Sequence, residues 1–300
     1  MRVCVRVPAS SANLGPGFDC LALALDLHNQ FSLALTEGGL HISVQGEGSG
    51  RLPANASNLV ALAAERLFAH LGRRPAGLDI AIVNQVPVGG GLGSSATAVL
   101  GGLMGANALL GGPLSSAELL ALAVELEGHP DNVAAALHGG LTLAVLEAAG
   151  PLVESIPVPA MRVAVVVPDF ELPTAGSRAA LPAEAPVADA VFNLGRLGLL
   201  LRAFQAGDYA LLAAGMQDRL HQPRRVLLVP GLEAALAAGR QAGAAATAIS
   251  GAGPAAIAFG PNERLPAAAE AMAAAFEAAG VGCRHWLLRV AHQGAKLRLC

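Results

Sequence analysis

The sequence has little lysine, few aromatic residues and few charged residues. Its single lysine is Lys296, and only 3% of its 300 residues are aromatic and 14% charged. The formal net charge is −3. Nucleic-acid binding normally requires a basic face and rings for stacking, so we expect no nucleic-acid partner.

The sequence also has no C-x-x-C pair, no good signal-peptide pattern and no long apolar run. Its cysteines are scattered: Cys4, Cys20, Cys283 and Cys300. With no C-x-x-C pair, we expect reduced thiols, no zinc site and no disulfide framework. Arg2 and Arg6 interrupt the N-terminal apolar run, which makes it a poor signal peptide. No uninterrupted run reaches the roughly 18 apolar residues of a membrane span, so we expect no membrane partner and a cytoplasmic location.

Glycine, in contrast, is concentrated in one stretch between an apolar strand pattern at 78–83 and a helical pattern at 96–110. The stretch is Pro87, Val88, Gly89, Gly90, Gly91, Leu92, Gly93, Ser94, Ser95, Ala96 and Thr97. Without Cβ atoms, backbone N–H groups can converge on an anion, and the helix start adds free N–H groups. The pattern predicts a phosphate-binding loop. A tight strand-to-helix turn with two serine caps explains the same letters.

Two common phosphate loops do not fit this stretch. A Walker loop needs a Gly-Lys-Ser/Thr step, and Lys296 is far from the glycines. Residues 91–96 match the dinucleotide pattern G-x-G-x-x-G/A, but the first acidic residue after them is Glu118. Because Glu118 lies in a predicted helix rather than at the end of a second strand, a dinucleotide site is disfavoured.

The segment Pro-x-x-x-Gly-Leu-Gly-Ser-Ser-Ala resembles the ATP loop of the GHMP kinases. The resemblance implies that all of residues 87–97 contact ATP without a Walker lysine. It also implies an α+β, two-domain GHMP kinase fold. Residues 1–150 would form an ATP-binding domain like domain 2 of ribosomal protein S5, and residues 151–300 a ferredoxin-like domain. A hinge at Ala148–Pro151 fits this division.

Small, Gly- and Pro-punctuated residues at 8–20 predict a loop, between strands at 1–7 and 21–27. A further strand is expected at 31–35 after a turn at His28-Asn29, and a helix at 58–71. The letters PASSANLGPGFD resemble the first motif of the homoserine kinase branch of the family. By this resemblance Asn13 and Asp19 would receive the ammonium of L-homoserine, for which a carboxylate is a natural partner.

The polar run at 125–133 is also compatible with a helix stop followed by a new helix. Glu-Gly-His-Pro-Asp-Asn-Val resembles the second motif of the same branch in a short form. The resemblance implies that Glu127 binds Mg²⁺ together with the Ser94 hydroxyl. Asn132 would contact the hydroxyl that is phosphorylated, and His129 would line the pocket. The shortened motif leaves Glu125 as a rival metal ligand.

Three further segments resemble the family in the second half. Thr174 and Arg178 hold the spacing of a threonine and an arginine that reach the substrate. His221-Gln222-Pro223-Arg224-Arg225 places Arg225 at a family arginine, with Arg224 as a rival. Two arginines could clamp a carboxylate, although exposed charge is the usual state of arginine. Residues 250–254 resemble the motif that packs against the ATP loop.

Together the motifs imply ATP-dependent phosphorylation of L-homoserine to O-phospho-L-homoserine in threonine biosynthesis. The implied catalytic residues are Asn132, Asp19, Ser94 and Glu127, with Mg²⁺ as metal. No general base is assigned, since the Asn132 amide has no useful pKa. A GHMP kinase for another acceptor, a dinucleotide oxidoreductase and a non-catalytic sensor remain alternatives, and a homodimer remains open.

Overall fold

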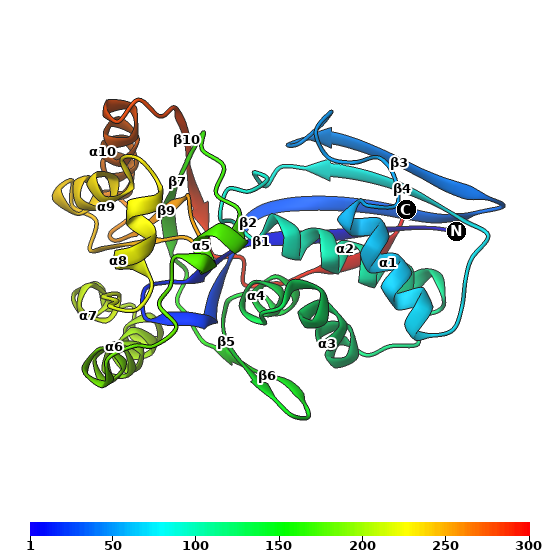
Figure 1. The fold of residues 1–300 in the computed structure, drawn as a ribbon, viewed down its shortest axis with the longest axis horizontal. Coiled ribbons are helices and arrows are strands. Elements are labelled where there is room, and N and C mark those ends of the chain that lie inside the picture. Colours follow the sequence, from blue (N-terminus) through cyan, green and yellow to red (C-terminus); the bar gives the residue numbers. More distant parts are fainter.

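The computed structural model describes residues 1–300 and contains two β-sheets (Figure 1). The first sheet has the order β11-β1-β2-β4-β3, with β5 paired to β2 and β6 paired to β5. All its pairs are antiparallel except β3 with β4. Its strands are β1 Arg2–Asn13, β2 Gly17–Thr36, β3 Gly39–Gly46, β4 Gly77–Asn84, β5 Leu141–Glu147, β6 Gly150–Ile156 and β11 Lys296–Leu299.

Four helices cover one face of this sheet (Figure 1). They are α1 Leu59–His70, α2 Ser94–Leu109, α3 Ser116–Glu127 and α4 Asp131–His138. Asn58 caps α1, and Ser115 and Glu118 form a capping box at α3. Apolar side chains of the sheet and the helices, such as Phe31, Leu100 and Leu120, meet in one buried core. This core fixes the start of α2 against the sheet.

The second sheet has the order β10-β7-β9-β8 and is antiparallel throughout. Its strands are β7 Arg162–Pro168, β8 Ala246–Ile249, β9 Ala256–Phe259 and β10 Cys283–Arg289. Helices α9 Leu232–Gln241 and α10 Leu265–Ala278 share a core with this sheet. The chain order β7-α9-β8-β9-α10-β10 and the strand order together confirm the predicted ferredoxin-like half.

The remaining helices lie between β7 and α9 in the chain. They are α5 Thr174–Ala179, α6 Val187–Ala206, α7 Tyr209–Gly215, α8 Gln222–Arg225 and a 3₁₀ helix at Val226–Leu228. Phe204 of α6 packs edge-on against Phe259 of β9. None of the helices combines the length and apolar character that crossing a membrane requires.

The prediction of a loop at 8–20 and a turn at His28-Asn29 is wrong. Strand β1 extends to Asn13, and β2 runs without a turn from Gly17 to Thr36, with a register shift opposite Pro8 and Ala9. The small residues serve close packing instead of loop formation. Ala135 of α4 lies in a small cluster with alanines of β1 and β2, where larger side chains would keep the helix away from the sheet.

The hinge expected at Ala148–Pro151 is a hairpin turn. Glu147 of β5 pairs with Gly150 of β6, so β6 continues the first sheet. The chain then enters the second sheet at β7 and returns to the first sheet with β11, which pairs with β1. The division at residue 150 stays a prediction, but β6 and β11 both lie with the N-terminal half.

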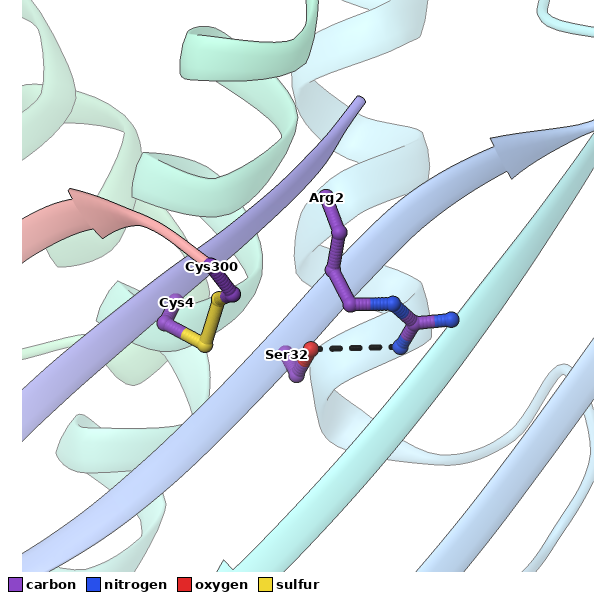
Figure 2. The surroundings of a disulfide bond; sticks show 4 residues. All are labelled: Arg2, Cys4, Ser32 and Cys300. Atoms are coloured by element: carbon purple, nitrogen blue, oxygen red, sulfur yellow. Dashed lines mark hydrogen bonds between the residues drawn. A yellow bond between two sulfur atoms is a disulfide. The ribbon is translucent and has the colours of Figure 1, made fainter.

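The expectation that the cysteines are all reduced is wrong for two of them. Cys4 and Cys300 form a disulfide that joins residues 296 positions apart (Figure 2). Their Cα atoms are 5.9 Å apart because β11 lies antiparallel beside β1. Scattered positions in the sequence carried no sign of this pairing. Cys20 and Cys283 are free thiols, as expected.

Candidate active site

A cavity of about 530 Å³ brings the predicted site residues of both halves together. It is lined by the following predicted residues: Asn13, Asp19, Val88, Gly89, Gly90, Gly91, Gly93, Ser94, Ser95, Glu127, His129, Asn132, Thr174, Arg178 and Arg225. Pro87, Leu92, Ala96 and Thr97 do not line it and are buried. These four residues support the loop instead of facing the cavity.

The Gly-rich loop ends in an uncapped helix start. Gly93 is the N-cap of α2, in the left-handed region at φ 66°, and offers no side chain to cap the first N–H groups. Ser94 and Ser95 are the first helical residues, so the alternative in which they act as caps is wrong. Free N–H groups and the positive end of the helix dipole at a cavity wall form a suitable phosphate site.

Neighbouring segments hold this loop in place. The side-chain oxygen of Asn29 in β2 accepts hydrogen bonds from the N–H groups of Gln85 and Val86. Ser250 donates from its hydroxyl to the carbonyl of Gly91 at 2.7 Å, which confirms the predicted packing of residues 250–254 against the loop. A Cβ at Gly91 would lie 2.5 Å from the Ser250 carbonyl oxygen, so this position requires glycine for packing alone.

Asp19 and Arg178 form an ion pair inside the cavity. Two guanidinium nitrogens of Arg178 donate to the two carboxylate oxygens of Asp19 at 2.7 and 2.9 Å. Asp19 has a left-handed backbone at φ 58°. Asn13 stabilises this backbone, since its side-chain oxygen accepts from the Asp19 N–H while its amide donates to the Gly251 carbonyl. Asn13 therefore positions Asp19 in the structure.

Arg225 is the most unusual charge of the cavity. It is 2% exposed, no carboxylate pairs with it, and its Nε has no hydrogen-bond partner. Burial, followed by the nearby Arg178, lowers the pKa of Arg225. Both guanidinium groups lie over the ring of Phe18, at 5.0 Å for Arg225 and 5.6 Å for Arg178. A buried, unpaired guanidinium is strongly unfavourable without an anion, so this end of the cavity suits a carboxylate or phosphate.

The rival Arg224 is exposed and does not line the cavity. His221 holds Arg225 from the other side. The His221 Nε2 lies 2.7 Å from the Gly15 carbonyl and donates to it, and Nδ1 lies 3.4 Å from Arg225. A guanidinium can only donate, so Nδ1 accepts from Arg225. Burial lowers the pKa of His221.

Asp131 is a cavity residue that sequence reasoning missed. It is 2% exposed, lines the cavity and contacts His129 Nδ1 at 2.8 Å. The hydrogen bond to Asp131 raises the pKa of His129. Asp131 also accepts from the Asn132 N–H, while Ser10 donates to the Asn132 side-chain oxygen at 2.9 Å. Asp131 begins α4, a usual place for an acidic residue, and it is also a buried carboxylate at the cavity.

Glu127, the last residue of α3, lines the cavity beside the start of α2. Its carboxylate accepts from the Ser95 hydroxyl at 2.9 Å, while the Ser94 hydroxyl lies 3.5 Å from the Val86 carbonyl. Burial raises the pKa of Glu127. The rival Glu125 is exposed, pairs with Arg66 at 2.6 Å and does not line the cavity.

This donor set fits Mg²⁺. The ion is commonly held by one or two carboxylates together with substrate phosphates, and it keeps several waters. The Glu127 carboxylate, in contact with the Ser95 hydroxyl at the uncapped start of α2, gives that combination. The structure contains no group of three or more His, Cys, Asp or Glu side chains that could hold a metal ion by themselves.

Comparison with known proteins places the chain in a family. The model of the GHMP kinases N-terminal domain matches residues 58–140, and the model of the C-terminal domain matches residues 200–278. The homoserine kinase of Moorella thermoacetica is 45% identical over 292 residues, which are 97% of this chain and 98% of the relative. The chain therefore belongs to the GHMP kinase family.

Solved structures agree with this placement. The crystal structure of homoserine kinase from Cytophaga hutchinsonii superposes with a TM-score of 0.89 at 33% identity, over 99% of this chain and 97% of that chain. L. major mevalonate kinase in complex with R-mevalonate has a TM-score of 0.73 at 19% identity, over 95% of this chain and 94% of that chain. The second likeness concerns the fold alone.

Proposed function

We propose that the chain transfers a phosphoryl group from ATP to the hydroxyl of L-homoserine, giving O-phospho-L-homoserine for threonine biosynthesis. Its relatives named homoserine kinase support this substrate. The observation that carries the proposal is the charge set Asp19, Arg178 and Arg225, which lines the same cavity as the Gly-rich loop. One negative and two positive groups suit a zwitterion whose hydroxyl faces bound ATP.

The Asp19–Arg178 pair gives a simple account of amino-acid binding. The substrate ammonium takes the place of Arg178 at Asp19, and the substrate carboxylate takes the place of Asp19 at Arg178. Each protein charge keeps an opposite partner through this exchange, so neither is left desolvated and alone. Arg225 gains the anionic partner that it lacks in the unliganded chain.

The phosphate end of the cavity binds ATP through backbone groups. The N–H groups of Gly89 to Ser95 and the start of α2 hold the phosphates, and positioning with charge stabilisation supplies most of phosphoryl-transfer catalysis. Asn132, held by Ser10, orients the substrate hydroxyl. His129 lines the substrate pocket, and Thr174 of α5 reaches the same substrate.

Mg²⁺ would be held by Glu127 and the Ser94 hydroxyl, and it supplies neutralisation of phosphate charge. Ser95 donates a hydrogen bond to Glu127 and so orients this carboxylate. The proposed location of the reaction is the cytoplasm. Sedimentation velocity measures whether the protein is a homodimer.

An ADP-release assay over homoserine, serine, mevalonate and galactose tests the function. We expect homoserine to give the highest kcat/KM. A higher value for another acceptor would overturn the substrate but leave a kinase. ATP and homoserine binding without ADP release would make the chain a sensor, and an NADH fluorescence titration excludes or reveals dinucleotide binding.

A further inference from the structure

A second cavity lies away from the proposed active site and shares no residue with it. Its volume is about 310 Å³. Strands β1 and β2 supply Arg6, Asp26 and His28, the connection from β10 to β11 supplies residues 290–294, and β11 supplies Lys296. The cavity therefore lies where the chain passes from the second sheet back to the first.

Positive charge is in excess at this cavity. Arg6 and Lys296 are directly opposite each other in the β1–β11 register. Like charges in directly opposed strand positions are destabilising, and Lys296 is the single lysine of the chain. The one carboxylate of the cavity, Asp26, is 49% exposed and lies 3.9 Å from the nearest guanidinium nitrogen of Arg6. It does not balance both cations.

His28 adds a hydrogen-bond donor. Arg6 lies 2.9 Å from His28 Nδ1, and a guanidinium can only donate, so Nδ1 accepts and Nε2 carries the proton. Burial and the neighbouring Arg6 lower the pKa of His28, in agreement with a neutral ring. No protein acceptor contacts its Nε2–H, although the His28 side chain is only 9% exposed.

The connection from β10 to β11 forms the rest of the cavity wall. The segment is anchored by hydrogen bonds from Ala291 N–H to Ala24 and from Ala295 N–H to Ala136. Between these anchors the N–H groups of residues 292, 293 and 294 donate to no backbone or side-chain acceptor in the protein. Consecutive free N–H groups beside cationic side chains are a common arrangement for binding anions.

We propose that this second cavity binds a phosphate-class anion, either inorganic phosphate or a small phosphomonoester. Such a ligand accepts from several donors at once and relieves the repulsion between Arg6 and Lys296. The volume accommodates a phosphate with a short organic chain. The bound anion joins β1 and β2 to the β10–β11 connection.

A thermal-shift titration with inorganic phosphate, at ionic strength held constant with sodium chloride, tests the site. The full chain is first saturated with a non-hydrolysable ATP analogue and homoserine, so that the Gly-rich loop is not the phosphate acceptor. Lys296→Gln is compared with Arg298→Gln, because both remove one exposed cation from β11 and only Lys296 lines the cavity.

We expect phosphate to raise the Tm of the wild type and of Arg298→Gln equally, and to bind Lys296→Gln about tenfold more weakly. Glycerol 3-phosphate as a second ligand separates the two sources. If glycerol 3-phosphate binds more tightly than inorganic phosphate, the ligand of the cavity is a phosphomonoester. If the two bind equally, the ligand is phosphate itself. The proposal is overturned if phosphate does not shift the Tm of the wild type, or if Lys296→Gln and Arg298→Gln bind phosphate equally. This outcome does not depend on the phosphoryl-transfer activity.

Discussion

Replacing Asp19 by asparagine tests the charge exchange proposed for homoserine. The change removes a charge but keeps the shape, and asparagine tolerates the left-handed backbone that Asp19 adopts at φ 58°. Asp19 binds both guanidinium nitrogens of Arg178, so the variant leaves Arg178 without its partner. In the complex, the substrate ammonium loses its carboxylate.

The magnitude follows from the exposure of the pair. Losing one partner of a desolvated, hydrogen-bonded charge pair costs about 2–5 kcal/mol. The side chains of Arg178 and Asp19 are 38% and 35% exposed, so solvent screening favours the lower end. A loss of about 2 kcal/mol corresponds to roughly a 30-fold decrease in kcat/KM for homoserine. Mevalonate has no ammonium and is spared this loss.

Steady-state kinetics with homoserine and mevalonate measure the discrimination between the two acceptors. We expect the wild type to prefer homoserine strongly. In Asp19→Asn the ratio of kcat/KM for homoserine to kcat/KM for mevalonate should fall about 30-fold. The matched control is Asp79→Asn, because Asp79 forms an ion pair of similar exposure with Arg2 outside the cavity. An unchanged preference in Asp19→Asn, or an equal loss in the control, would refute the reasoning.

Three further predictions concern the metal, the disulfide and pH. Glu127→Gln should raise the Mg²⁺ concentration for half-maximal activity at least about tenfold, and Glu125→Gln should not; the reverse order would move the metal site. Cys300→Ser should lower the free energy of unfolding by up to about 5 kcal/mol in denaturant titrations, since the disulfide closes a loop across 296 positions; equal stability with and without reductant would contradict this. The folded-state pKa of His129 is raised, so its stabilisation is complete below about pH 6.5 and is lost as pH rises through the raised pKa. His129→Gln should therefore lower Tm more at acidic than at alkaline pH, and a uniform loss would exclude this titration.

Local sequence patterns predicted the elements around the Gly-rich loop well. The glycines within 89–93 and the apolar run after them define a turn and a helix through properties of neighbouring residues alone.

The segment at 8–20 was misread as a loop because its structure depends on contacts with distant residues. Ser10 and Ser11 have the composition of a loop, yet both are fully buried because β2 pairs with them and α4 packs beside them. Such pairing is not encoded in neighbouring letters.

Contacts between distant segments were the other limit. The sequence could place Asp19 and Arg178 in one pocket by resemblance, but not predict that they pair with each other across 159 positions. Asp131 escaped notice because a first-turn acid is common at helix starts, and only the structure shows it buried. Burial likewise distinguishes Arg225 from its exposed neighbour Arg224, which the sequence had left as a rival.

The return of β11 to the first sheet makes the ferredoxin-like half an insertion between two strands of the other half. It is connected on one side through β6 and on the other through the segment before β11 (Figure 1). A unit tethered at both ends cannot swing out freely as one tethered at a single end can. Buried side chains of the two halves, such as Leu21 of β2 and Val165 of β7, also meet in one core, so packing as well as the two connections joins the halves. The Cys4–Cys300 bond lies beyond the second connection and holds β11 beside β1, so it keeps that connection attached to the first sheet.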